Sequence, residues 1–403
     1  MLERVIWRGL TSRPLWLVLG LANMTAGVVI ALRPNQSFDV EKVAQWCREW
    51  LILGVNPYSG VDIHANYPPY ALVLLSPLAL LPAHLVNAAW AIISAVMAVV
   101  AGWLGLNLTD ERPIERSFQL SIGFFLAWES VRIGLGLGQF TLVAFVCGLA
   151  AVRYPGKIGR GMLLGIAMIK PQVGAAFVLW AILEGALSSV LWAVAPIVIG
   201  TLLFAARLGQ SPLAVLGLYG DILRNELAAP GFREGALELR PLIHGLIAQP
   251  TVADAIHLGI VGASLLLLVV ASRRMNRAGR ALFVLPLTCL WTLMSVYHPA
   301  YDFVLLWPVA VAISVCVADV SRKAVVLGAI AAVQLVLVVD VPGLWWKLNG
   351  RPAPHAYGLL TTAVMHFDRL LVVALFAALV TLSFRWHPAD HPVTLPGHAI
   401  PAS

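Results

Sequence analysis

The chain contains a series of long apolar runs, and these restrict its fold more than any other feature. Each is close to the roughly 20 residues that a helix needs to cross a bilayer. Of the 403 residues, 60% are hydrophobic and 12% are charged, whereas a soluble domain has about 25% charged residues. So little charge cannot cover a soluble particle of this size, which excludes a soluble enzyme and a disordered chain. We expect membrane segments at residues 15–32, 84–106, 117–133, 138–153, 158–184, 187–206, 253–271, 281–297, 302–319, 324–341 and 367–385.

The predicted fold class is an all-α polytopic membrane protein with about 11–13 membrane helices, including broken or re-entrant segments. Residues 1–403 form a single integral membrane domain. The run at 15–32 lacks a small-residue cleavage site and is expected to remain as a helix. Residues 68–81 are apolar but short and bounded by proline, which favours an interfacial or re-entrant segment.

The net charge of +7 does not indicate a nucleic-acid binder. The basic residues form short clusters between apolar runs, as in cytoplasmic loops that face anionic lipid. Cys47 lies alone in a polar stretch and the other three cysteines lie in apolar runs, so we expect neither a disulfide nor a metal site. The 14 tryptophans are interpreted as interfacial anchors.

Arginines predict the orientation of the chain. Three of them precede the first apolar run, which places the N-terminus in the cytoplasm and residues 33–68 on the outer side. Residues 272–280 carry four arginines and are also expected in the cytoplasm. These two assignments conflict if every apolar run crosses the membrane once.

The conflict disappears if the chain turns back at Lys170-Pro171. Proline removes a backbone donor and disfavours helix in the residue before it. Residues 159–169 and 172–183 would then be two half-helices, and such breaks occur where protein or water satisfies the backbone. This arrangement puts several polar segments on the same, extracytoplasmic side: residues 33–68, 134–139, Lys170, 207–252, 297–302 and 342–366.

The first of these segments begins with Asp39, directly after the first predicted span. Its carboxylate could accept a proton from an acceptor hydroxyl in a group transfer. Alternatively, Asp39 could cap the following helix, since aspartate is a preferred N-cap. That helix, with Trp46 and Trp50, is expected to lie on the membrane surface.

Lys170 and His298 are the other two candidates for chemistry. An intramembrane lysine is costly and indicates a functional site, here for a lipid phosphate, although snorkelling at a helix end is the alternative. His298 could bind a phosphate or donate a proton if Asp302 raised its pKa, with Tyr301 and Asp302 orienting it. A helix-capping role for His298 is the structural alternative.

Three further segments have weaker signals. The glycines at 134–138 lack the strand–helix context of a nucleotide loop and instead allow a tight turn. Residues 207–252 mix acidic and basic side chains and favour a solvated amphipathic helix. Trp345 and Trp346 are typical of an interfacial anchor and could also stack on a sugar.

The order of these motifs resembles glycosyltransferase family 87, membrane mannosyltransferases of the GT-C superfold. The resemblance spans roughly residues 35–305. It rests on Asp39, residues 54–58, Tyr67-Pro68-Pro69, Gly138-Gln139, the helix with Gly161, Gly165 and Lys170-Pro171, and Tyr297-His298 with Tyr301-Asp302.

The resemblance implies transfer of a sugar, typically mannose, from a polyprenyl-phosphate donor to a lipid-linked or glycan acceptor. The reaction would invert the anomeric centre at the extracytoplasmic face of the plasma membrane, in glycolipid synthesis for the cell envelope, and would involve no nucleic acid, cofactor or metal. We therefore expect Asp39 as general base with His298 as the second catalytic residue. The donor phosphate would be bound by Lys170, Gln139, Tyr301 and Arg233, and the substrates by Tyr58, His64, Tyr67, Asp302, Trp345 and Trp346.

The main rival is a lipid or solute transporter that uses the same outer cavity, because broken helices and midplane charges also mark transporter substrate sites. The clustering of polar residues on one face argues against it.

Overall fold

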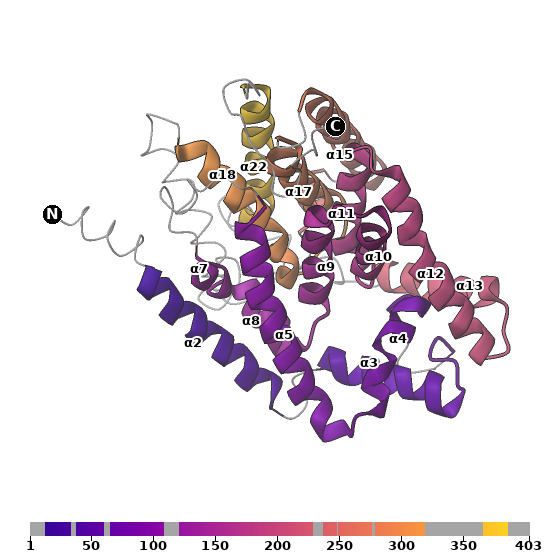
Figure 1. Cartoon of the computed structure of the whole chain (residues 1–403). Coiled ribbons are helices and arrows are strands. Elements are labelled where there is room, and N and C mark those ends of the chain that lie inside the picture. Colours follow the sequence, from indigo (N-terminus) through magenta and orange to yellow (C-terminus); the bar gives the residue numbers. More distant parts are fainter. Residues whose placement is uncertain are drawn as a thin grey trace, which may run out of the picture.

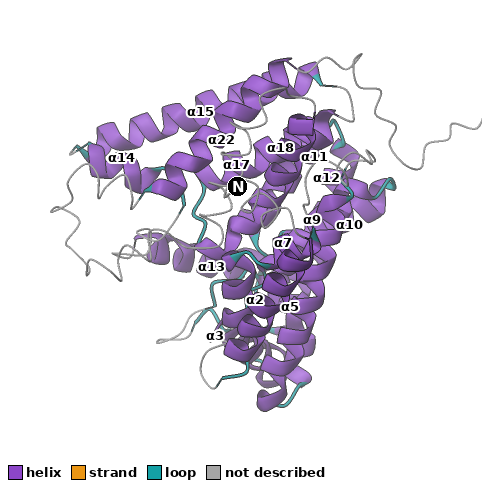
Figure 2. Cartoon of the chain, turned by 90° about the vertical axis from the view of Figure 1, so that its left-hand side faces the viewer, coloured by secondary structure: helices purple, strands orange, loops and turns teal. Residues whose placement is uncertain are grey.

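The computed structural model describes residues 13–33, 38–59, 65–108, 121–228, 237–247, 249–275, 279–318 and 366–385. Helices form nearly all of this part, and it contains no strand (Figure 2). The all-α membrane fold predicted from the apolar runs is therefore confirmed.

Five helices in the described part are long and apolar enough to cross a membrane. Each coincides with a predicted span. They are α2 (Arg13–Ala31), α5 (Ala83–Leu106), α12 (Leu187–Arg207), α15 (Pro250–Arg274) and α22 (Phe367–Arg385).

The remaining described helices are shorter, and several of them correspond to predicted spans. They are α3 (Phe38–Arg48), η1 (Glu49–Leu53), α4 (Pro69–Leu75), η2 (Ser76–Leu80), α7 (Ile122–Leu126), α8 (Glu129–Leu137), α9 (Thr141–Arg153), α10 (Lys157–Ala167), α11 (Pro171–Leu183), α13 (Pro212–Ala228), α14 (Arg240–Leu246), η3 (Arg280–Val284), α17 (Leu285–Ser295), η4 (Ala300–Leu306) and α18 (Trp307–Ala318).

One predicted span is wrong. Residues 117–133 were expected to form a single helix, but α7 ends at Leu126 and α8 begins at Glu129. Trp128 between them is extended, with ψ 138°, and its ring is fully buried. The break in the helix directs the indole ring of Trp128 toward the core. The predicted span 324–341 and the outer loop 342–366 lie outside the described residues.

The predicted reversal at Lys170-Pro171 is confirmed. Helix α10 ends at Ala167, Lys170 is extended (φ −118°, ψ 91°), and Pro171 is the first residue of α11. At the other end of this hairpin, Nη1 of Arg160 lies 3.0 Å from Oε2 of Glu184. The proline therefore converts one apolar run into two antiparallel half-length helices.

Glycines hold α10 close to α12. A Cβ on Gly161 would lie 2.5 Å from the Ser189 carbonyl oxygen, and one on Gly165 would lie 2.6 Å from that of Ala193. Small residues four apart allow helix backbones to approach this closely in membrane proteins. These two glycines of the family resemblance therefore have a packing role.

Helix α3 lies across the lower end of α5 (Figure 1). Its predicted helical form is confirmed, but the orientation expected for its tryptophans is wrong. Trp46 and Trp50 are 3% and 4% exposed, and the Trp50 ring stacks on Phe204 of α12 at 5.2 Å. The interfacial role expected for the tryptophans also fails for Trp128, Trp180 and Trp307, which are buried in the core.

Two hydrophobic clusters form the core. The larger includes residues of α2, α7, α8, α9, α10, α11, α15, α17, α18 and α22, the smaller includes residues of α3, α4 and α13, and α5 and α12 contribute to both. Phe140 belongs to the smaller cluster and Leu142 to the larger. Helices α8 and α9 both belong to the larger cluster, so the turn between them reaches into the smaller cluster through Phe140, and the polar residues of this turn lie at the junction of the two.

Candidate active site

A cavity of about 310 Å³ lies at this junction. Its wall comes from α3, the segment before α4, the α8–α9 turn, the α10–α11 turn, α13 and the segment between α17 and η4. The lining residues are Asp39, Asn66, Tyr67, Pro68, Gln139, Ile169, Lys170, Pro171, Gln172, Tyr219, Leu223, Glu226, Val296, Tyr297 and Tyr301. Most of the segments predicted to share the outer side thus meet at one cavity.

Gly138 brings Gln139 against Asp39. It ends α8 in the left-handed conformation, with φ 70°, and a Cβ there would lie 2.6 Å from Cγ1 of Val40. Glycine alone suits both the backbone angle and the close approach to α3. The side-chain amide of Gln139 consequently donates a hydrogen bond to Oδ2 of Asp39.

Lys170 is almost fully buried, with 3% of the residue exposed. Its ammonium lies 2.5 Å from Oγ1 of Thr141, 2.8 Å from Oδ1 of Asp302 and 3.2 Å from Oε1 of Gln139. It also lies 3.9 Å from the centre of the Tyr301 ring. An ammonium has three donors, so these contacts satisfy all of them.

Gln139 connects the acidic and the basic group of the cavity. Its amide nitrogen faces Asp39 and its amide oxygen faces Lys170. Only this orientation suits both neighbours, because the flipped amide would direct its oxygen at a carboxylate and its NH₂ at an ammonium. One side-chain amide is therefore hydrogen-bonded to both the carboxylate of Asp39 and the ammonium of Lys170.

Asp302 organises the opposite side of Lys170. Oδ1 of Asp302 also accepts a hydrogen bond from Thr141, at 2.8 Å, and Oδ2 lies 3.1 Å from Nδ1 of His298. Asp302 and His298 are both completely buried, and neither contributes to the cavity wall described above. In this structure Asp302 positions Lys170 and His298, so the substrate contact and the catalytic role expected for these two residues stay predictions.

His298 retains one unused nitrogen. Its Nε2 is buried and has no hydrogen-bond partner among the described residues. A buried polar atom without a partner is costly. This nitrogen is therefore available to a ligand or a water that would complete its environment.

The environment of Asp39 favours a proton acceptor. Burial raises the pKa of its carboxyl above the ordinary value of 3.8, while the hydrogen bond from Gln139 and the charges of Lys170 and Lys42 act in the opposite direction. A base with a raised pKa takes a proton more readily. Asp39 also lies in the first turn of α3, where an acidic side chain stabilises the helix. It therefore combines this helix-stabilising position with a place in the cavity wall.

The two tyrosines predicted to bind the substrates differ in position. Tyr67 lines the cavity. Tyr58 is 3% exposed and lies behind it, where its hydroxyl donates a 2.6 Å hydrogen bond to the Tyr67 carbonyl oxygen. Tyr58 thus supports the wall, and substrate binding by it stays a prediction. His64, Arg233, Trp345 and Trp346 lie outside the described residues.

Several residues in and behind the cavity wall were not predicted. Thr141 contacts both Lys170 and Asp302, and its signal was a hydroxyl two residues after Gln139. Tyr219, Leu223 and Glu226 follow i, i+4, i+7 spacing and present one face of α13 to the cavity. The rest of α13 fits the predicted amphipathic helix, since Asp221 and Arg224 are exposed.

The described part of the chain holds no group of three or more His, Cys, Asp or Glu side chains arranged for a metal ion. Independence from metals and cofactors stays a prediction.

Comparison with known proteins supports the family resemblance. Glycosyltransferase family 87 matches residues 66–299, more than half of the chain. No curated protein and no solved structure matches. The matched stretch contains Gln139, Lys170 and His298 but ends before Asp302 and begins after Asp39, and those two acids are connected to it by their hydrogen bonds with Lys170 and Gln139. The chain belongs to glycosyltransferase family 87 and is a membrane glycosyltransferase.

Proposed function

We propose that this protein transfers a mannosyl group from a polyprenyl-phosphate donor to a lipid-linked or glycan acceptor, with inversion, at the extracytoplasmic face of the plasma membrane. The observation that carries the proposal is the pairing of Asp39 and Lys170 in one cavity, bridged by Gln139. A base and a cation a few ångströms apart suit a displacement in which one side loses a proton and the other gains negative charge.

In the proposed step, an acceptor hydroxyl oxygen forms a bond to the anomeric carbon. The bond from that carbon to the phosphate oxygen breaks, and polyprenyl phosphate leaves with the electron pair. The hydroxyl proton passes to Asp39. Because Gln139 already donates a hydrogen bond to Oδ2 of Asp39, the other carboxylate oxygen, Oδ1, receives the proton. A single displacement from the face opposite the leaving group inverts the configuration.

Lys170 stabilises the leaving phosphate in this proposal. Its three donors are already satisfied by protein oxygens, so a phosphate has to displace one of them. The 3.2 Å contact with Gln139 is the longest, and we expect it to be exchanged. Stabilisation of developing charge in a site with little water is a large term in catalysis.

The charge of the described wall favours a further cation. Asp39 and Glu226 bring two carboxylates to the cavity, and the one lysine is paired with Asp302. Arg233 follows Glu226 by seven residues in the chain and remains our candidate for the donor phosphate. His64, Trp345 and Trp346 remain candidates for sugar contacts.

Membership of a glycosyltransferase family weighs against the transporter alternative. The direct test is a transfer assay with the purified protein in lipid nanodiscs, polyprenyl-phosphate mannose labelled in the sugar, and an envelope lipid extract as acceptor. We expect labelled product from the wild type and almost none from Asp39→Asn. Transfer from a nucleotide sugar, with none from the lipid donor, would overturn the proposed donor.

The proposed face can be tested separately. Arg273 and Leu213 are both exposed and lie in segments predicted on opposite sides. Cysteines at these positions, in a background without Cys47, can be labelled in intact cells with an impermeant thiol reagent. We expect labelling at position 213 and not at 273. The reverse pattern would place the cavity on the cytoplasmic side.

A further inference from the structure

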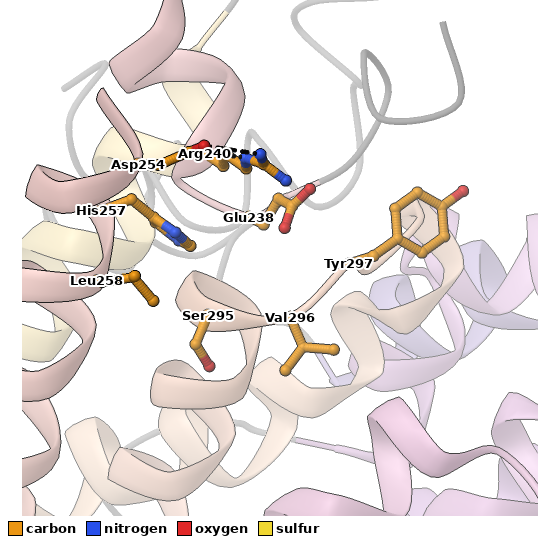
Figure 3. Close-up of a pocket in the computed structure, with 8 residues that line it drawn as sticks. All are labelled: Glu238, Arg240, Asp254, His257, Leu258, Ser295, Val296 and Tyr297. Carbon is orange, nitrogen blue, oxygen red and sulfur yellow. Dashed lines mark hydrogen bonds and ion pairs between the residues drawn. The ribbon is translucent and has the colours of Figure 1, made fainter. Parts of the chain in front are cut away.

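A second cavity, of about 460 Å³, lies beside the first. Figure 3 shows its lining residues: Glu238, Arg240, Asp254, His257, Leu258, Ser295, Val296 and Tyr297. Val296 and Tyr297 line both cavities. The short segment that joins α17 to the residues around His298 is therefore a wall that the two spaces share.

Backbone hydrogen bonds fix this dividing segment. The amide of Leu237 donates to the His298 carbonyl oxygen at 2.9 Å, and the amide of Leu239 donates to that of Met294 at 3.0 Å. Glu238 lies between these two contacts, so the chain that forms one wall of the second cavity is tied to the chain that carries His298. The second cavity is consequently a built part of the active-site region.

His257 gives the second cavity a buried ring nitrogen without a hydrogen-bond partner among the described residues. The residue is 8% exposed, and its Nε2 has no hydrogen-bond partner among the described residues. Its imidazole projects from α15 toward the segment with Ser295 and Val296 (Figure 3). A neutral imidazole nitrogen can donate or accept a hydrogen bond, and hydroxyl groups can serve either need.

The charges around the cavity favour a neutral ligand. Arg240 forms a two-point ion pair with Asp254, with N–O distances of 2.8 and 3.1 Å, so its charge is matched inside the wall. Glu238 adds a further carboxyl group. A phosphate would meet an acidic side chain and a guanidinium already paired, whereas a hydroxyl group can donate to or accept from the unused imidazole nitrogen of His257.

We propose that the second cavity binds the acceptor through a neutral, hydroxyl-rich saccharide unit, next to the cavity in which the donor reacts. This rests on the proposed function, because it divides one reaction between two neighbouring spaces. Tyr297, which lines both, is the residue past which the acceptor hydroxyl reaches Asp39. The donor phosphate is confined to the first cavity.

The experiment uses the purified full chain in nanodiscs and two variants of α15. His257→Leu removes the unused nitrogen with little change of volume. Leu258→Trp narrows the cavity, and Leu266→Trp is its matched control, since Leu258 and Leu266 are 68% and 64% exposed on the same helix and residue 266 lines neither cavity. The measurements are acceptor KM, donor KM and the slow hydrolysis of the donor without acceptor.

We expect the acceptor KM to rise by about 2- to 10-fold in His257→Leu, the range for one lost hydrogen bond, and further in Leu258→Trp. Donor KM and donor hydrolysis should remain those of the wild type in both, and Leu266→Trp should match the wild type throughout. An unchanged acceptor KM in Leu258→Trp, or an equal rise in donor KM, overturns the inference. Absence of transfer by the wild type would instead refute the proposed function.

A binding measurement tests the ligand class. Saturation-transfer NMR with methyl α-mannoside and with mannose 6-phosphate compares a neutral with an anionic probe on the same protein. We expect a signal from the neutral probe that Leu258→Trp abolishes and Leu266→Trp retains. A stronger signal from the phosphorylated probe, lost in Leu258→Trp, would show that the cavity binds anions and would refute the neutral class.

Discussion

The α10–α11 hairpin carries one buried ion pair at each end, and the two pairs have different neighbours. At the turn, the Lys170–Asp302 side chains are 4% and 0% exposed, and the lysine ammonium also contacts the side chains of Gln139, Thr141 and Tyr301. At the open end, the Arg160–Glu184 side chains are 8% and 11% exposed. There, Arg160 also donates to the Tyr154 carbonyl oxygen, and Arg280 donates to that of Glu184.

The difference shows how a structural pair can be told from a functional one. Burying either pair costs desolvation that the attraction only partly offsets. At the open end, Arg160 and Arg280 each donate a hydrogen bond to a backbone carbonyl oxygen, and these bonds hold the ends of neighbouring helices. Lys170 lines a cavity and connects through Gln139 to a second ionisable group. Connection to a cavity, more than burial, therefore distinguishes the end of the hairpin that we propose is catalytic.

The largest effect is expected at Asp39. Asp39→Asn keeps the size and an oxygen that can accept the Gln139 hydrogen bond but cannot take a proton, so turnover should fall by about 10²-fold or more, the range for lost general-base catalysis. Thermal melting in detergent should change little. The control is Asp221→Asn on α13, whose side chain is 62% exposed. Near-normal turnover by Asp39→Asn would reduce Asp39 to a helix-stabilising residue.

Replacing each ion pair as a whole tests the comparison directly. Removing one partner of a buried pair destabilises by about 3–5 kcal/mol, whereas replacing both by groups of similar volume is often neutral. Lys170→Met with Asp302→Asn should therefore recover most of the stability lost in Lys170→Met alone, yet turnover should remain lower by about 10²-fold.

At the open end of the hairpin, the equivalent double variant should behave differently. Arg160→Met with Glu184→Leu should recover stability relative to Arg160→Met and keep near-normal turnover per folded molecule. Melting temperatures and initial rates of all four variants check both statements. Equal losses of turnover at the two ends would mean that the Lys170–Asp302 pair is structural.

A smaller effect, with a defined pH signature, is expected at Gln139. Its hydrogen bond lowers the pKa of Asp39 against the larger effect of burial. Gln139→Leu removes that contribution, so the pKa of Asp39 should rise. The base must be deprotonated to act, and the acid limb of the pH profile of kcat/KM should therefore move to higher pH. Gln172→Leu, also in the cavity wall, is the matched control. If the acid limb does not move, Gln139 does not control the pKa of Asp39.

Local signals in the sequence predicted the elements better than their contacts. Pro171 predicted the hairpin because proline acts on its own neighbours. Asp39, Lys170 and Asp302 were selected by residue type and Gln139 by the family resemblance, and all four were placed on one side by counting crossings. Their contacts, however, join residues 31 to 161 positions apart.

Other features depend on such tertiary contacts, and the local sequence did not identify them. Thr141 was missed because a threonine in an apolar helix is common. The tryptophans were assigned to the membrane surface because hydropathy cannot distinguish lipid from a protein core as the surroundings of an indole.

The smallest predicted effect is a coupling between Lys170 and His298. Both contact Asp302, one at each carboxylate oxygen, and residues that share a partner couple by about 0.5–3 kcal/mol. Turnover of Lys170→Met, His298→Gln and the double variant should therefore be non-additive at saturating donor. Repeating this double-mutant cycle in an Asp302→Asn background tests whether Asp302 transmits the coupling, because the shared carboxylate charge is then absent. Coupling that disappears there assigns it to Asp302. Coupling that persists, together with a raised donor KM in both single variants, would instead place His298 Nε2 and Lys170 on the donor phosphate.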